Sequence, residues 1–119
     1  AYPKPQLRPH QKFAGRDEIT YQEVTKDGWQ PKGTYSGKLA ENITQAVARD
    51  CLAAKMLELD RHGYDIVMHV HDEVVIEAPK GTAEAALDQV LKIMAKPLSW
   101  APGLPLNADG YACEYYQKD

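Results

Sequence analysis

The longest regular pattern in the chain lies between residues 38 and 62 and is helical. Apolar side chains recur there at spacings of three and four residues, which is typical of an amphipathic helix. Ser36 can cap its start, and Arg61, His62 and Gly63 have the chemistry of a helix end. We therefore predict one long helix, of about 25 residues and roughly 37 Å.

Shorter patterns follow this helix. Residues 65–70 and 74–78 are rich in Val and Ile and predict two strands of a β-hairpin, separated only by His71-Asp72-Glu73. Residues 82–96 repeat the helical spacing, with Thr82 as the expected N-cap and Pro97 as a stop. Residues 104–116 are expected to contribute a last strand.

The N-terminal part has a different character. Residues 1–15 contain three prolines and little periodicity, so they predict an irregular arm. Residues 18–24 are rich in β-branched and aromatic residues and, with turn chemistry at Lys26-Asp27-Gly28, predict a hairpin. The arm is basic, and it could lie against phosphates or be an ordinary solvated end. Its basic residues are Lys4, Arg8, Lys12 and Arg16.

Composition narrows the class of protein. The chain has 119 residues, 44% hydrophobic and 26% charged, as expected of one soluble globular domain. Its net charge of −3 argues against nucleic-acid binding through bulk positive charge, so any such contact must be local. Cys51 and Cys113 lack CxxC spacing, and no segment resembles a signal peptide or membrane span, which favours a reduced, cytosolic chain. The start at Ala1 fits either removal of Met or a piece of a longer polypeptide.

The tripeptide His71-Asp72-Glu73 is the strongest candidate for chemistry. His-Asp is a poor choice for the positive-φ positions of a tight hairpin loop, so a role other than hairpin stability is indicated. Two carboxylates at a hairpin tip suit Mg²⁺, which takes its other ligands from water and substrate phosphates. The alternative is an ordinary acidic surface turn.

Two further patterns carry weaker signals. His69 and His71 share one face of a strand and could recruit Zn²⁺, although no further ligand spacing supports such a site. Asn42, Gln45 and Arg49 form a polar stripe on the long helix that could reach base edges and phosphates in a minor groove. A solvated helix face is the alternative for this stripe.

Taken in order, the long helix, the strand 69–77 and the ending 103–111 resemble the C-terminal end of family-A DNA polymerases, the phage type above all. Val70-His71-Asp72-Glu73 matches motif C of the family's palm. The family's preceding helix usually carries Gln-Gly-Thr-Ala-x-Asp, where this chain reads Gln45-Ala-Val-Ala-Arg-Asp50. Gln, Ala and Asp are kept, whereas Gly and Thr are not.

This resemblance implies an α+β fold: an antiparallel sheet built on the motif C hairpin and the last strand, packed against two helices. Residues 1–34 would be an N-terminal arm and hairpin leading into the palm, and residues 35–119 the C-terminal palm segment. Motifs A and B, the fingers, the thumb and the exonuclease part are not found in this sequence. The chain would therefore be part of a longer polymerase acting in the cytoplasm of a bacterial host, and inactive alone.

The resemblance also implies roles. The parent enzyme would transfer deoxynucleotides to a primer 3′-hydroxyl by two-metal phosphoryl transfer, with primer–template DNA and deoxynucleoside triphosphate as partners. Asp72 and Glu73 would be the catalytic, Mg²⁺-binding residues of this chain. The primer strand would be contacted by His71, Gln45, Asn42 and Arg49. A non-catalytic nucleic-acid-binding module derived from a palm, and a small metal-binding domain using His69, His71 and Asp72, remain as alternatives.

Overall fold

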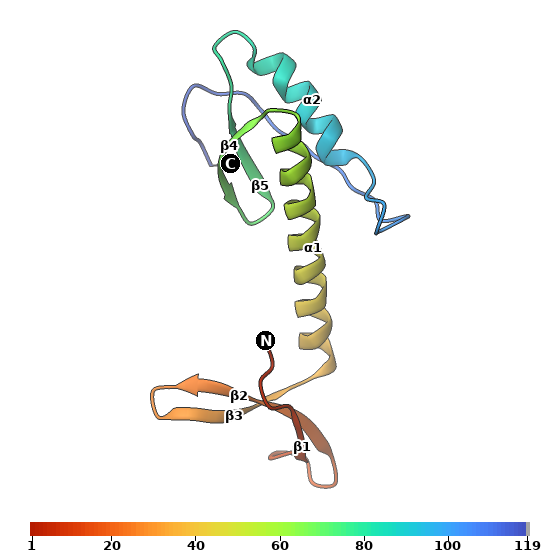
Figure 1. The fold of residues 1–119 in the computed structure, drawn as a ribbon. Coiled ribbons are helices and arrows are strands. Elements are labelled where there is room, and N and C mark those ends of the chain that lie inside the picture. Colours follow the sequence, from red (N-terminus) through yellow and green to blue (C-terminus); the bar gives the residue numbers. More distant parts are fainter. Residues whose placement is uncertain (119) are drawn as a thin grey trace. The chain divides into compact units, whose positions relative to one another are not determined.

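The α+β class is confirmed by the computed structural model, which describes residues 1–118 (Figure 1). The chain divides into two compact units, Ala1–Ala46 and Val47 onward, and each is described here by itself. Its elements are, in order, β1 (Gln6–Pro9), β2 (Asp17–Thr25), β3 (Gly28–Thr34), α1 (Ser36–Arg61), β4 (Asp65–Val70), β5 (Glu73–Glu77) and α2 (Ala83–Ala95).

The first unit contains a three-stranded antiparallel sheet in the order β1-β2-β3. The hairpin expected around Lys26-Asp27 is confirmed, with Val24 opposite Trp29 next to the turn. The irregular arm expected over residues 1–15 is wrong for residues 6–9, because these pair with β2, Leu7 lying opposite Ile19. Pro9 is tolerated because it ends an edge strand, where one missing N–H costs little.

The long helix α1 is confirmed within two residues at its start and one at its end. It ends at a glycine with left-handed backbone, since Gly63 has a φ of 83° and its N–H donates to the Asp60 carbonyl at 2.9 Å. The N–H of Tyr64 closes back on the Leu59 carbonyl at 3.2 Å. This cap turns the chain out of the helix and into β4.

In the second unit, β4 and β5 form the expected hairpin as a two-stranded antiparallel sheet with an irregularity between Ile66 and Met68. The loop is one residue shorter than expected, because Glu73 already pairs with Val70. The helix α2 is confirmed, but the Thr82 side chain does not cap it. Its hydroxyl donates instead to the Pro79 carbonyl at 2.7 Å.

The last strand expected over residues 104–116 is not formed. This segment holds Pro105 and Gly110 and lacks β-branched residues, so its intrinsic preference for a strand is low. It lies along α2 instead: a Cβ built on Gly110 would meet Leu87 at 3.2 Å and Leu91 at 3.5 Å. The sheet built on the motif C hairpin therefore has two strands in the described chain.

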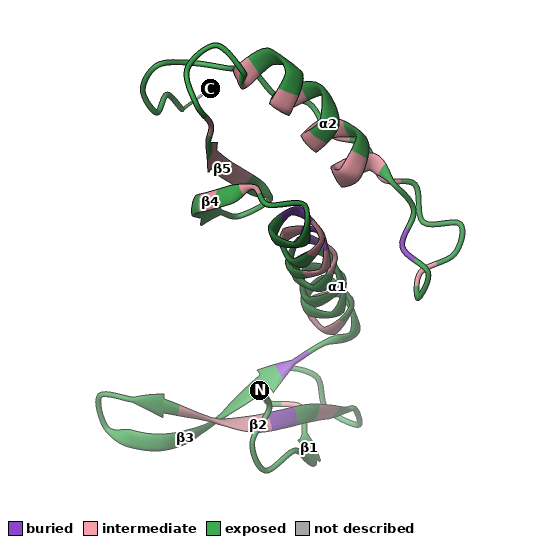
Figure 2. Cartoon of the chain, turned by 45° about the horizontal axis from the view of Figure 1, so that its top comes forward, coloured by how far each residue is buried: buried purple, intermediate pink, exposed green. Residues whose placement is uncertain are grey.

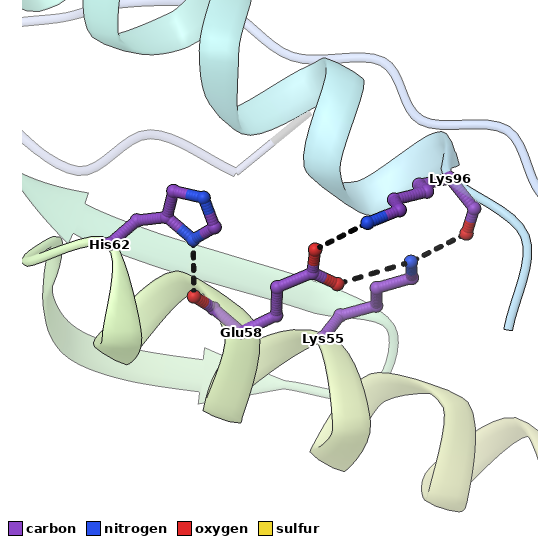
Figure 3. Close-up of polar contacts among 4 residues, drawn as sticks. All are labelled: Lys55, Glu58, His62 and Lys96. Carbon is purple, nitrogen blue, oxygen red and sulfur yellow. Dashed lines mark hydrogen bonds and ion pairs between the residues drawn. The ribbon is translucent and has the colours of Figure 1, made fainter. Parts of the chain in front are cut away.

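A buried lysine joins α1 to the end of α2 (Figure 3). Lys55 is only 3% exposed, and its Nζ donates to the Lys96 carbonyl oxygen at 2.5 Å and lies 3.7 Å from the Glu58 carboxylate. Lys96 also reaches Glu58, at 3.4 Å. His62 Nδ1 donates to the Glu58 backbone carbonyl at 2.8 Å. Because a lysine at this depth needs partners for its charge, this cluster fixes where α2 ends.

Few apolar side chains are buried (Figure 2). Among the described residues only Leu52, Leu59 and Leu98 form the buried apolar core, while Ile43, Leu57 and many other large apolar side chains are exposed. No described helix combines the length and hydropathy that crossing a bilayer requires. The free cysteines differ in exposure, Cys51 being half-buried and Cys113 exposed.

Candidate catalytic site at the β4–β5 turn

The turn between β4 and β5 consists of only two residues, His71 and Asp72, closed by the pairing of Val70 with Glu73. His71 has a φ of 52°, in the left-handed region that non-glycine residues rarely adopt. Asp72 is not among the described residues with positive φ, so the signs of φ match a type II′ turn. The turn residues are thus unfavourable, as the sequence indicated, and the unfavourable backbone conformation is that of His71.

The two candidate carboxylates lie at the end of this turn. Asp72 and Glu73 are both exposed, and no lysine, arginine or histidine of the described chain forms an ion pair with either one. Exposed oxygen donors without a protein cation fit Mg²⁺, which keeps several waters and binds only one or two carboxylates. The tip can therefore supply part of a metal shell.

Glu73 has a protein partner that the sequence did not indicate. The Tyr116 hydroxyl lies close enough to the Glu73 carboxylate to be influenced by it. Partial desolvation, followed by the charge and the hydrogen-bonding capacity of Glu73, raises the pKa of Tyr116 above its usual value. In the same tail, the Tyr111 hydroxyl donates to the Gln117 carbonyl at 2.6 Å.

His69 contacts α1 rather than a metal partner. Its Nδ1 lies 3.4 Å from Nη1 of Arg49. Neighbouring residues on a strand point to opposite faces, so His69 and Glu73 belong to different faces of the hairpin, since Glu73 pairs with Val70. No group of three or more His, Cys, Asp or Glu side chains in residues 1–118 could hold a metal ion, so the geometry does not support the zinc module based on His69, His71 and Asp72.

The remaining residues predicted to contact a primer lie along α1. Asn42 donates to the Tyr2 hydroxyl, and Gln45 donates to Glu41 at 3.3 Å. Arg49 follows Gln45 by one helical turn and contacts His69, as described above. All three are exposed, and their DNA-binding roles, like those of Asp72, Glu73 and His71, stay predictions.

The chain is similar to DNA polymerases of a phage and of plant organelles. The whole chain is 52% identical over 120 aligned residues to a DNA polymerase of Bacillus phage SP02, of which it covers 18%. It is 31% identical over 83 residues to DNA polymerase I A, chloroplastic, of Oryza sativa subsp. japonica, covering 65% of this chain and 8% of that protein. DNA polymerase I B, mitochondrial, of the same plant is 37% identical over 59 residues, or 44% of this chain and 6% of that protein.

No protein-family profile matches the chain, and no solved structure does. The chain spans less than a fifth of each of these longer relatives, so it corresponds to one segment of them. The phage and plant organellar likenesses confirm the resemblance that Val70-His71-Asp72-Glu73 indicated. The chain is similar over its whole length to one segment of a phage DNA polymerase, as expected from the resemblance described in the sequence.

Proposed function

We propose that this chain is the part of a DNA-directed DNA polymerase that brings the carboxylates of Asp72 and Glu73 to the reacting phosphate. The observation that carries the proposal is the tip of the β4–β5 hairpin, which holds both carboxylates exposed and without a protein cation, in a chain 52% identical to a phage DNA polymerase. The substrates would be primer–template DNA and a deoxynucleoside triphosphate. The reaction would join the primer 3′-hydroxyl to the α-phosphate and release pyrophosphate.

Asp72 is the proposed catalytic and metal-binding residue of this chain. Bound Mg²⁺ ions would neutralise charge on the attacking and leaving oxygens. Asp72 is suited to hold such an ion because the tight turn places it at the exposed tip of the hairpin, and because no side-chain cation of the described chain pairs with its oxygens. Glu73 would assist next to it, with Tyr116 close to its carboxylate.

The other residues would position the primer. His71 precedes Asp72 in the turn and would place its imidazole beside the primer terminus. Gln45 and Asn42 would donate to minor-groove acceptors, and Arg49 to a phosphate. These contacts would act on the position of the DNA rather than on the developing charge.

The test uses a polymerase that contains this segment, with Asp72→Asn. Removing a group that stabilises charge only in the transition state should lower kcat by roughly 10²–10³-fold. The dissociation constant for primer–template should change by less than about threefold, because phosphate contacts elsewhere hold the DNA. Single-turnover primer extension and a DNA-binding titration measure the two quantities.

Asp88→Asn is the matched control, since Asp88 is an exposed carboxylate on α2 that pairs with Lys92. It should leave both quantities unchanged. Equal losses of rate and affinity from Asp72→Asn would assign Asp72 to DNA binding, and unchanged rate would favour the non-catalytic module. The 119-residue chain alone should extend no primer, because it would lack the partner carboxylate and a triphosphate site.

A further inference from the structure

A second site lies in the first unit, away from any residue assigned above. A groove of about 580 Å³ is formed between the loop that follows β1 and the facing parts of β2 and β3. Arg8, Lys12 and Phe13 line one side, and Thr20 and Gly33 line the other. A Cβ on Gly33 would come within 2.4 Å of a Glu18 carboxylate oxygen, so glycine leaves room for the Glu18 side chain on this side of the groove.

The loop that walls the groove has a defined shape. His10 Nδ1 accepts from the N–H groups of Lys12 and Phe13, at 3.0 and 3.3 Å, and the His10 N–H donates to the Arg16 carbonyl at 2.8 Å. The Phe13 ring is held by the His10 ring, with 4.9 Å between centroids, and by the Arg16 guanidinium, 5.8 Å from the ring centroid. Phe13 nevertheless remains 56% exposed. The loop thus presents an aromatic ring whose position is already fixed.

A second aromatic residue lies on the same sheet face. Val24 has the same strand parity as Thr20, and its cross-strand neighbour is Trp29. Both side chains of this pair are well exposed, Val24 at 64% and Trp29 at 63%. Exposed aromatic rings therefore lie at two places on this face of the sheet, Phe13 at the groove and Trp29 at the β2–β3 hairpin.

The charge of this unit is opposite to that of the other one. Residues 1–46 carry seven Lys and Arg against five Asp and Glu, whereas residues 47–119 carry seven against twelve. In the groove, Arg8 and Lys12 carry positive charge and Glu18 is the acidic lining residue, whereas the charge of Lys32 is paired with Glu23 at 3.0 Å. A polyanion is therefore attracted to the first unit and repelled by the second.

We propose that this groove binds single-stranded DNA, with phosphates on Arg8 and Lys12 and bases stacked on Phe13 and Trp29. Proteins commonly hold single strands by combining exposed aromatic rings with basic side chains, because unpaired bases are free to stack. Duplex DNA offers no such bases. The choice of DNA as the ligand rests on the proposed polymerase function. The geometry and charge of the groove are observed independently of that function.

The test measures binding of a fluorescently labelled oligothymidine to the 119-residue chain by anisotropy. Phe13→Ala should weaken binding roughly tenfold, as expected when one base loses its stacking partner. Phe13→Leu, which keeps the apolar volume but not the flat ring, should weaken it nearly as much. Arg8→Gln with Lys12→Gln should lower affinity and flatten its salt dependence. Lys80→Gln with Lys92→Gln, two exposed lysines of the second unit, is the matched control and should change nothing.

Circular dichroism shows for each variant that the fold is retained. Absence of binding, equal binding of a blunt duplex, or equal affinity in Phe13→Leu and the original chain would overturn the proposal. If the chain binds oligothymidine but Asp72→Asn leaves the rate of primer extension unchanged, the groove inference stands and the proposed function fails.

Discussion

At the scale of single residues, His71 determines the geometry of the β4–β5 turn. With a φ of 52° it allows a two-residue connection, which sets Asp72 beyond the last pair of the hairpin, Val70 with Glu73. Left-handed backbone costs an L-residue roughly 1–2 kcal/mol, so this turn is held against a local preference. Such strain is common where a site needs a particular backbone shape.

This gives a prediction for His71 variants. His71→Val should destabilise the β4–β5 hairpin by about 1–2 kcal/mol, because a β-branched side chain tolerates positive φ poorly. His71→Gly should be neutral within about 1 kcal/mol, since relief of strain offsets the greater freedom of the unfolded glycine. Hydrogen exchange of the β4 and β5 amides measures both. Equal protection in His71→Val and the original chain would mean that the turn adopts another conformation.

The tight turn at residues 71–73 could be predicted because it depends on local sequence, two short strands separated only by these residues. The partner of Glu73 could not be predicted in this way. Tyr116 is distant in sequence and lies in a tail without periodicity, so no spacing rule connects the two. The contact of Arg49 with His69 could not be predicted either, because these residues lie 20 positions apart in different elements.

At the scale of elements, Lys55 is the side chain that connects helices. Lys55→Met should lower the free energy of unfolding by about 2–3 kcal/mol, because the Lys96 carbonyl and part of Glu58 lose a buried donor while the apolar stem is kept. Lys92→Met is the control, since Lys92 is 76% exposed and pairs with Asp88 one turn away. It should change stability by less than about 0.5 kcal/mol. Urea unfolding compares the stability of the two variants. Equal losses of stability would contradict the role of Lys55 in connecting α1 to the end of α2.

The elements with strong periodicity were predicted within one or two residues, as α1 and α2 show. The wrong predictions concern segments whose structure depends on contacts with residues distant in sequence. β1 forms in a proline-rich stretch because β2 offers it an open edge. Residues 104–116 form no strand because their contacts run along α2 instead.

For the whole molecule, the small apolar core governs behaviour in solution. Leu59 is fully buried, so Leu59→Ala should cost about 2–5 kcal/mol of stability. Leu57 is 59% exposed two positions earlier, and Leu57→Gln should cost less than about 0.5 kcal/mol while reducing self-association. Thermal unfolding and light scattering measure the two effects. Greater self-association in Leu57→Gln would show that the exposed apolar surface is not what brings chains together.

The proximity of Tyr116 to Glu73 has a thermodynamic consequence. A cation bound to Glu73 would reduce the negative charge that acts on the phenol, so cation binding and the contact of the tail with Glu73 would be coupled. Linkage requires this coupling to be reciprocal: whatever free energy the tail gains from Glu73 is subtracted from the affinity of the cation, and the reverse. If Asp72 and Glu73 bind a cation as proposed, Tyr116→Phe should therefore raise the affinity of the tip for that cation.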